Sequence, residues 1–181
     1  PVRDSLGEMV IRQPMPSMPI RFWNDTGDER YRASYFTKFT GVWTHGDWVG
    51  IDASDGSLTI HGRSDATLNR DGVRIGTAEI YAAVETMPEV ADSLVVGVER
   101  PDGGYRMPLF VVLRSGAEQG PALEARIRST IRERCSPRHV PDEVIVVPEI
   151  PYTLSGKKME TPVKRILAGA EPDSVASRDT M

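Results

Sequence analysis

The chain has 181 residues and a formal net charge of −4, with 39% hydrophobic and 27% charged residues, as is usual for a globular protein. The acidic balance excludes a general nucleic-acid binder, which needs a basic surface, and no apolar run is long enough to cross a membrane. A single cysteine, Cys135, excludes an internal disulfide and fits a reducing compartment such as the cytoplasm, and with three scattered histidines it forms no metal-binding pattern.

The first 61 residues predict a β-rich segment with one helix. An apolar run over residues 7–13 is typical of a strand, and three prolines then interrupt regular structure. Four aromatic residues within 31–39 recur at helical spacing. Residues 41–51 and 58–61 predict two strands joined by a hairpin turn at Asp55-Gly56. The segment is too short and too often broken by proline to be a domain alone. Since the chain also lacks an initiator Met, we expect a piece of a longer protein.

Strand and helix patterns alternate after residue 71. Strand-like runs occupy residues 72–75, 93–98, 109–113 and 144–147. Between them, one helix is expected after an N-cap at Thr77, and another carries Leu123 to Cys135 on an apolar stripe. A last helix is expected to start with Thr161 as N-cap and to end at Gly169. The order β-α-β-β-α-β-α predicts an α+β fold, a small domain whose mixed sheet is flanked by helices.

The stretch from Gly62 to Glu79 is dense in charge and poor in apolar periodicity, which suits a polar connector that moves or contacts a phosphorylated ligand. Arg63 could hold a phosphate or ribose oxygen, or form a surface salt bridge. Asp65 could absorb the rotation of a hinge, or be an ordinary loop residue. Upstream, Asp47 could accept hydrogen bonds from ribose hydroxyls, although a turn aspartate is the commoner role.

Lys157 lies in the polar segment PYTLSGKKME, where the preceding glycine lets a lysine extend without crowding. A phosphate-binding P-loop is excluded because Pro151 stands where that motif needs glycine and Lys158 where it needs Ser or Thr. From this segment alone, a solvated turn lysine is the favoured interpretation.

A basic cluster follows in Arg126, Arg128, Arg132, Arg134, Arg138 and His139. It could meet a phosphate-rich ligand, but Glu124 and Glu133 lie among these residues, as on a solvated helix face. Cys135 is expected to be a core residue rather than a nucleophile. The three tryptophans are expected to pack rather than to stack on a ligand.

Four motifs together resemble the adenylate-forming superfamily, which comprises acyl-CoA synthetases, peptide-synthetase adenylation domains and luciferases. They are GEM at 7–9, HGDW at 45–48, GRSDATLNRDGVRIGTAEIY at 62–81 and IPYTLSGKKME at 150–160. Their order is that of the C-terminal part of these enzymes, and they are most similar to the acetoacetyl-CoA synthetases. Ala66 and Leu154 depart from many relatives, which have an acidic residue and an arginine there.

The resemblance implies a role for each matched position. Asp47 and Arg63 would bind the ribose of ATP or AMP, and Asn69 and Arg74 would lie near the adenylate phosphate.

Other matched positions would serve catalysis and acyl transfer. Lys157 would be the catalytic lysine of adenylation, and Asp65 the hinge of a mobile domain. Gly72 and Arg132 would contact coenzyme A. Mg²⁺ would accompany ATP on ligands outside this chain.

The resemblance also implies three parts. Residues 1–64 would end a large adenylation domain, residues 65–170 would form the mobile C-terminal domain, and residues 171–181 would be a disordered polar tail. The implied reaction converts acetoacetate, ATP and CoA through an acyl-adenylate to acetoacetyl-CoA, AMP and pyrophosphate, and the chain alone is expected to be inactive.

Three alternatives stay open. The acid could be another short-chain acid, or the chain could be a module whose Lys157 is acetylated and deacetylated by protein partners. It could also load a carrier protein, which the polar tail after Gly169 argues against.

Overall fold

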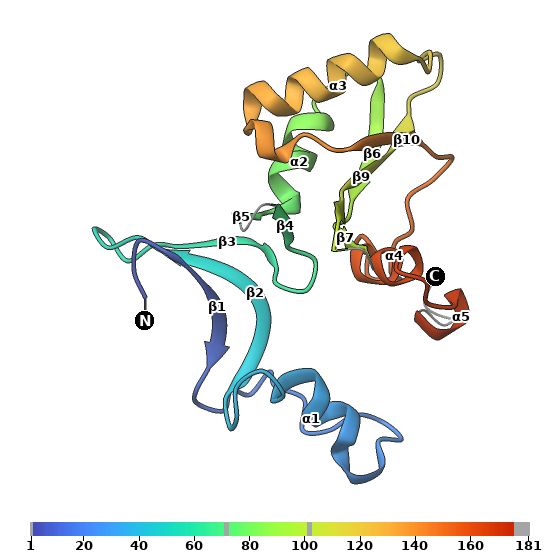
Figure 1. Cartoon of the computed structure of the whole chain (residues 1–181). Coiled ribbons are helices and arrows are strands. Elements are labelled where there is room, and N and C mark those ends of the chain that lie inside the picture. The colour runs from blue at the N-terminus through green and yellow to red at the C-terminus, as the bar shows by residue number, and fades with distance from the viewer. Residues whose placement is uncertain (1, 71–72, 101–102, 176–181) are drawn as a thin grey trace. The chain divides into compact units, whose positions relative to one another are not determined.

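The computed structural model describes residues 2–70, 73–100 and 103–175 (Figure 1). The chain divides into two compact units, Pro1–Asp65 and Ala66–Met181, hereafter unit 1 and unit 2. The division falls one residue from the boundary expected between residues 64 and 65, while rotation of one part against the other stays a prediction.

Unit 1 is built on a three-stranded antiparallel sheet in the order β1-β2-β3. Its strands are β1 (Leu6–Ile11), β2 (Trp43–Ile51) and β3 (Leu58–Arg63). The Asp52 N–H donates to Ser57 O at 3.0 Å, and Gly56 adopts a φ of +75°, which glycine tolerates best. The turn predicted at Asp55-Gly56 is therefore confirmed.

A cluster of aromatic rings packs on the start of β2. Tyr31 and Tyr35 of this cluster lie on α1 (Glu29–Tyr35), which follows the short 3₁₀ helix η1 (Thr26–Asp28). Tyr35 stacks on Trp43 with ring centroids 3.7 Å apart, and Trp43 is buried. The helix ends earlier than expected, so Phe39 lies outside it. Trp23 is 88% exposed, so the expectation that it packs is wrong within this chain.

The described residues of unit 2 combine helices with three short sheets. Its elements are β4 (Leu68–Arg70), β5 (Val73–Ile75), α2 (Thr77–Val84), β6 (Val90–Val95), β7 (Val98–Glu99), β8 (Tyr105–Arg106), β9 (Pro108–Leu113), α3 (Pro121–Arg134), η2 (Pro137–His139), β10 (Glu143–Val146), α4 (Glu160–Leu167) and α5 (Pro172–Val175). The predicted order is confirmed. Strands β4, β7 and β8 were not predicted, because two or three residues are too few to show a strand period.

The main sheet of unit 2 has the order β10-β9-β6, with β9 parallel to β10 and antiparallel to β6. Successive side chains of a strand point to opposite faces. Leu109 and Val111 of β9 thus join a core with Ile80 of α2 and Ile127 of α3. The alternate residues of β9, Phe110 and Val112, join a second core with Ile150 and with Val163 of α4. Helices therefore flank both faces of a mixed sheet, as the α+β prediction required (Figure 1).

Two helices start elsewhere than predicted. Thr77 is the first residue of α2, Gly76 is its N-cap, and no side chain caps the helix. Likewise α4 starts at Glu160 after Met159, so Thr161 lies within the first turn. Thr77 and Met159 are both buried. Burying a Met side chain is worth about 1.5–3 kcal/mol, more than the ~1 kcal/mol of a capping bond, so burial of Met159 outweighs a cap at Thr161.

The end of α4 agrees with the prediction. Gly169 has a φ of +97°, its N–H donates to Ile166 O, and the Ala170 N–H donates to Arg165 O. These two bonds form a Schellman motif, which stops a helix at glycine.

The tail is more ordered than expected, because residues 172–175 form α5. The N–H and Oγ of Ser174 both donate to Glu171 O and close this turn. Disorder is therefore the wrong expectation for these four residues, and residues 176–181 lie outside the described part of the chain.

Candidate functional site

The register of unit 1 brings Asp47 and Arg63 together, because Asp47 of β2 pairs with Arg63 of β3. His45 Nδ1 hydrogen-bonds one carboxylate oxygen of Asp47, and Arg63 Nη1 lies 3.9 Å from the other. Arg63 Nε donates to Asp65 at 3.2 Å. The Asp47 side chain is only 13% exposed, so its position is fixed by its neighbours.

Gly46 makes room for the Arg63 guanidinium. A Cβ at Gly46 would lie 2.9 Å from Arg63 Nη2, and the φ of +87° also disfavours other residues there. The HGDW motif therefore supplies a glycine that permits close approach as well as the carboxylate beside it.

A cavity of about 610 Å³ opens beside these residues, within the usual size range of small-molecule sites. Thr44, His45, Arg63 and Asp65 line it together with residues of α1. The Thr44 hydroxyl is buried and has no hydrogen-bond partner among the described residues. A hydroxyl, a carboxylate and a guanidinium suit the hydroxyl and phosphate groups of a nucleotide.

In unit 2, Asn69 and Arg74 face each other across the β4–β5 hairpin. The Asn69 N–H donates to the Tyr105 hydroxyl at 3.0 Å, which ties the hairpin to β8. Burial raises the pKa of Tyr105, so the hydroxyl stays neutral. Gly72, expected to contact coenzyme A, lies outside the described residues.

Lys157 lies in a tight turn after Gly156, whose φ is +75°. The Lys157 N–H donates to Thr153 Oγ1 at 3.1 Å, and Thr153 N–H donates to Lys157 O at 2.9 Å. The backbone of this lysine is therefore held while its side chain is exposed, an arrangement that fits a reactive lysine and a solvated one equally.

The neighbouring Lys158 was not singled out from the sequence, yet it is the more strongly bound of the two lysines. Its Nζ lies 2.5 Å from Glu85 Oε1, 2.8 Å from Asp92 Oδ1 and 2.6 Å from Ser93 O. Its side chain is 18% exposed. In the sequence, only its position next to Lys157 could have drawn attention to Lys158.

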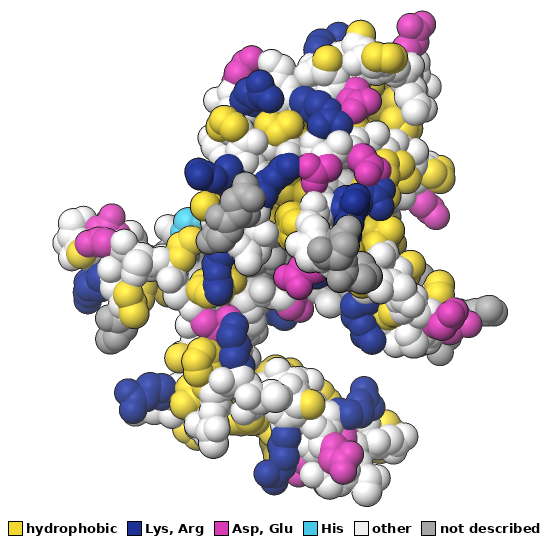
Figure 2. Space-filling model, in the orientation of Figure 1, with side chains coloured by type: hydrophobic (Ala, Val, Ile, Leu, Met, Phe, Trp, Pro, Cys, Tyr) yellow, Lys and Arg dark blue, Asp and Glu magenta, His cyan; other side chains and the backbone are white. Residues whose placement is uncertain are grey.

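Most residues of the basic cluster form ion pairs or hydrogen bonds with neighbouring side chains. Arg126 bonds Glu89, Arg128 bonds Glu124, and Arg134 donates to Thr86. Arg132 is exposed on the last turn of α3. On the face shown in Figure 2, Lys and Arg side chains are interspersed with Asp and Glu, so no continuous basic surface forms there.

Cys135 was expected in the core, but it is only partly buried and belongs to neither hydrophobic cluster of the described residues. Its Sγ donates to Glu79 O at 3.5 Å, and burial raises the pKa of the thiol. A raised pKa lowers the thiolate fraction and so the nucleophilicity.

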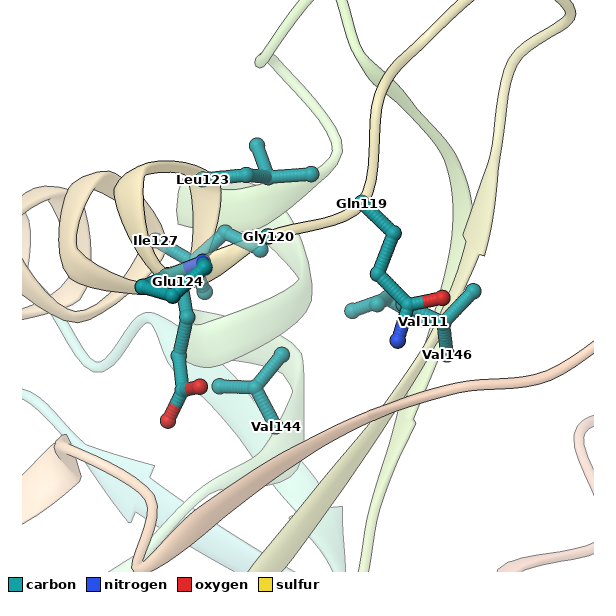
Figure 3. A pocket seen from close by; sticks show the side chains of 9 residues that line it. Val111, Gln119, Gly120, Leu123, Glu124, Ile127, Val144 and Val146 are labelled. Carbon is teal, nitrogen blue, oxygen red and sulfur yellow. The ribbon is translucent and has the colours of Figure 1, made fainter.

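A second cavity of about 200 Å³ lies between the start of α3 and strands β9 and β10 (Figure 3). Its lining is mainly Val, Leu and Ile side chains with Gln119 and Glu124 at its polar positions, and none of the described candidate residues lines it. Across residues 2–70, 73–100 and 103–175, no group of three or more His, Cys, Asp or Glu could hold a metal ion. In the same ranges, no helix combines the length and apolar character needed to cross a membrane.

Comparison with known proteins shows which family these motifs resemble. Residues 79–157 match the family model of the AMP-binding enzyme C-terminal domain. Acetoacetyl-coenzyme A synthetase of Rhizobium meliloti is 50% identical over 169 residues, which is 93% of this chain and 26% of the relative. The acetoacetyl-CoA synthetase of Gallus gallus is 46% identical over 171 residues, covering 94% of this chain and 26% of the relative.

Solved structures show the same similarity at the level of the fold. Acetoacetyl-CoA synthetase from Streptomyces lividans matches with a TM-score of 0.90 and 56% identity, over 99% of this chain and 27% of that one. An amide bond synthetase from Marinactinospora thermotolerans matches with a TM-score of 0.68 and 26% identity, over 92% of this chain and 31% of that one. The chain spans about a quarter of the length of the curated relatives it matches. It is homologous to the C-terminal portion of the acetoacetyl-CoA synthetases, in the adenylate-forming ligase family.

Proposed function

We propose that the chain is the C-terminal part of a cytoplasmic ATP-dependent acid–thiol ligase that forms acetoacetyl-CoA from acetoacetate. The observation that carries this proposal is the group formed by Asp47, His45 and Arg63 beside a cavity of about 610 Å³. This arrangement supports nucleotide binding, and homology to the acetoacetyl-CoA synthetases supports acetoacetate as the acid.

In the first half-reaction the acetoacetate carboxylate attacks the α-phosphate of ATP, and pyrophosphate leaves. Two negative groups approach each other, so a preorganised positive charge lowers the barrier. Lys157 supplies that charge, while Asp47 accepts hydrogen bonds from the ribose hydroxyls and Arg63 contacts the nucleotide beside it.

In the second half-reaction the thiol of coenzyme A attacks the acyl carbonyl, and AMP leaves. Asn69 and Arg74 contact the adenylate phosphate, and Gly72 and Arg132 contact coenzyme A. One small domain cannot present both sets of residues at once, so it rotates about Asp65 between the two steps.

The chain by itself is expected to be inactive. It spans about a quarter of its relatives, and the motifs discussed above include neither a phosphate loop nor a carboxylate pocket. Unit 1 also exposes Ile20 at 90% and Trp23 at 88%. Such side chains are suited to packing against further protein. AMP formation from acetoacetate, ATP and CoA by residues 1–181 alone would refute this part.

The catalytic proposal is tested by joining the chain to the N-terminal portion of the Streptomyces lividans enzyme. The fusion is expected to form AMP and acetoacetyl-CoA. Lys157→Ala should lower the rate by about 100-fold, the order of magnitude for removing a preorganised charge. Lys164→Ala on α4 is the matched control and should retain activity. A fully active Lys157→Ala variant would refute the role of Lys157.

The acid requires a separate assay, because the fusion takes its acid pocket from the relative. The full-length protein that contains this chain would be compared on acetoacetate, acetate and butyrate. A higher kcat/KM for acetate or butyrate would identify that acid, and not acetoacetate, as the substrate.

A second candidate function is regulation by acetylation of Lys157. The exposure of its side chain, next to the partly buried Lys158, favours this site. Acetylation would remove the charge used in adenylation, and a deacetylase would restore it. Mass spectrometry after incubation with a protein acetyltransferase and acetyl-CoA tests the idea. Absence of the modification at Lys157 would refute it.

A further inference from the structure

Lys158 is the centre of a polar cluster in unit 2. Its ammonium group contacts Glu85 after α2 and both Asp92 and Ser93 O on β6, and it lies 4.1 Å from the ring centroid of Tyr81. We call these residues, together with Tyr152, the Lys158 cluster.

The members of the Lys158 cluster also bond one another. Ser93 Oγ donates to Glu85 at 2.8 Å, and the Ser93 N–H donates to Asp92 at 2.8 Å. The Tyr81 hydroxyl lies 2.5 Å from Glu160 Oε1 at the start of α4. The cluster and its contact to Glu160 therefore join α2, β6 and α4 around one partly buried cation.

The loop that carries Lys157 is attached to this cluster at both of its ends. Tyr152 and Lys158 form an antiparallel bridge, and the Tyr152 hydroxyl donates to the other oxygen of Asp92 at 2.8 Å. Asp92 thus binds both residues of the bridge, and residues 153–157 form the closed turn between them.

The bridge also determines which lysine faces outward. Neighbouring residues in an extended segment point to opposite sides. Because Lys158 points into the cluster, Lys157 points away from it, and Lys157 is the exposed member of the pair.

Hydrogen bonds within the Lys158 cluster keep Lys158 and Asp92 ionised. Desolvation alone would lower the pKa of Lys158, but hydrogen bonds to Asp92 and Glu85 raise it above its ordinary value. Desolvation would raise the pKa of Asp92, but hydrogen bonds from Lys158 and Tyr152 lower it. Both groups are therefore ionised near neutral pH, when their attraction is strongest.

We propose that Lys158 is a positioning residue that fixes the loop carrying Lys157 in the orientation used for adenylation. The catalytic part of this inference rests on the proposed function, whereas the structural part concerns the two lysines alone. The second lysine of GKK is thus a specific requirement rather than a duplicate of the first.

The structural part is tested on the 181-residue chain with N-hydroxysuccinimidyl acetate, whose acyl carbon is attacked by a neutral amine as N-hydroxysuccinimide leaves. Cleavage after Glu149 and Glu160 releases both lysines in one peptide for mass spectrometry. Lys158 should acetylate at least severalfold more slowly than Lys157, because two carboxylates hold its ammonium group and its side chain is only 18% exposed. Asp92→Asn should accelerate Lys158 selectively. Equal reactivity of the two lysines would overturn the proposal.

The catalytic part is tested in the fusion enzyme by measuring the half-reactions separately. Lys158→Met should slow formation of the acyl-adenylate by about tenfold, because small displacements of a reacting group are costly. Thioester formation from preformed adenylate should change much less. Lys158→Arg, which can still bind both carboxylates, should restore part of the adenylation rate, and Tyr152→Phe should give a smaller loss in the same direction.

Each outcome decides between the hypotheses. A general loss of folding would lower both half-reactions together and would not respond to Lys158→Arg, and that result would overturn the positioning role. If Lys157→Ala leaves adenylation unchanged, the proposed function of Lys157 fails, while the labelling result on Lys158 stands by itself.

Discussion

Gly97→Ala should detach the β4–β5 hairpin from the rest of unit 2. A Cβ at Gly97 would lie 1.8 Å from the Tyr105 hydroxyl oxygen and 2.6 Å from the ring carbon that bears it. The backbone cannot yield easily, so Tyr105 must move. The Tyr105 hydroxyl would then lose the hydrogen bond that it accepts from the Asn69 N–H, in which the N···O distance is 3.0 Å.

The expected loss of stability follows from these contacts. Losing the hydrogen bond costs about 1 kcal/mol, and overpacking at a well-packed position costs about 1–3 kcal/mol. We therefore expect Gly97→Ala to lower the free energy of unfolding of unit 2 by about 2–4 kcal/mol. Tyr105→Ala removes the clash, so Gly97→Ala should cost little in that background, with a coupling energy of about 2–4 kcal/mol.

Hydrogen exchange measured by mass spectrometry on peptides of β4, β6 and β9 is the suitable assay. Tryptophan fluorescence would not report on unit 2, because all three tryptophans lie in unit 1. Gly120→Ala is the matched control, since a Cβ there meets nothing within 4 Å. Equal effects of the two glycine substitutions, or full additivity with Tyr105→Ala, would refute the reasoning.

Two further predictions concern the Lys158 cluster and the hinge. The lowered pKa of Asp92 means that its stabilisation is present above its unfolded pKa of about 3.9 and is lost as the pH falls through the folded value. Asp92→Asn should therefore be less stable than the original chain at pH 6, but should lose less stability on acidification from about pH 5; urea unfolding followed by circular dichroism tests this, and parallel pH curves would contradict it. Asp65→Pro in the fusion enzyme should impair switching between half-reactions more than nucleotide binding, and equal loss of both, in half-reaction rates and in the KM for ATP, would count against a hinge at Asp65.

Much of the fold could be predicted because its signals are local. The Asp55-Gly56 turn, the apolar stripe of α3 and the glycine stop at Gly169 each depend on residues a few positions apart. Short strands and helix starts could not be predicted in the same way. Thr77 and Thr161 have good capping side chains, but Thr77 is buried inside the first turn of α2 and Met159 takes the N-cap position of α4.

The sequence by itself determined the order of the elements, the resemblance to adenylate-forming enzymes and the set of candidate residues. Only the tertiary structure decided how those residues are held. Lys158 meets Glu85 73 positions away, and Asn69 meets Tyr105 36 positions away. Such contacts leave no periodic trace, because each depends on where the folded sheet brings distant segments together. The paired lysines show the difference: they are adjacent and identical in the sequence, but in the fold Lys158 is partly buried beside its bridge to Tyr152 and Lys157 is exposed.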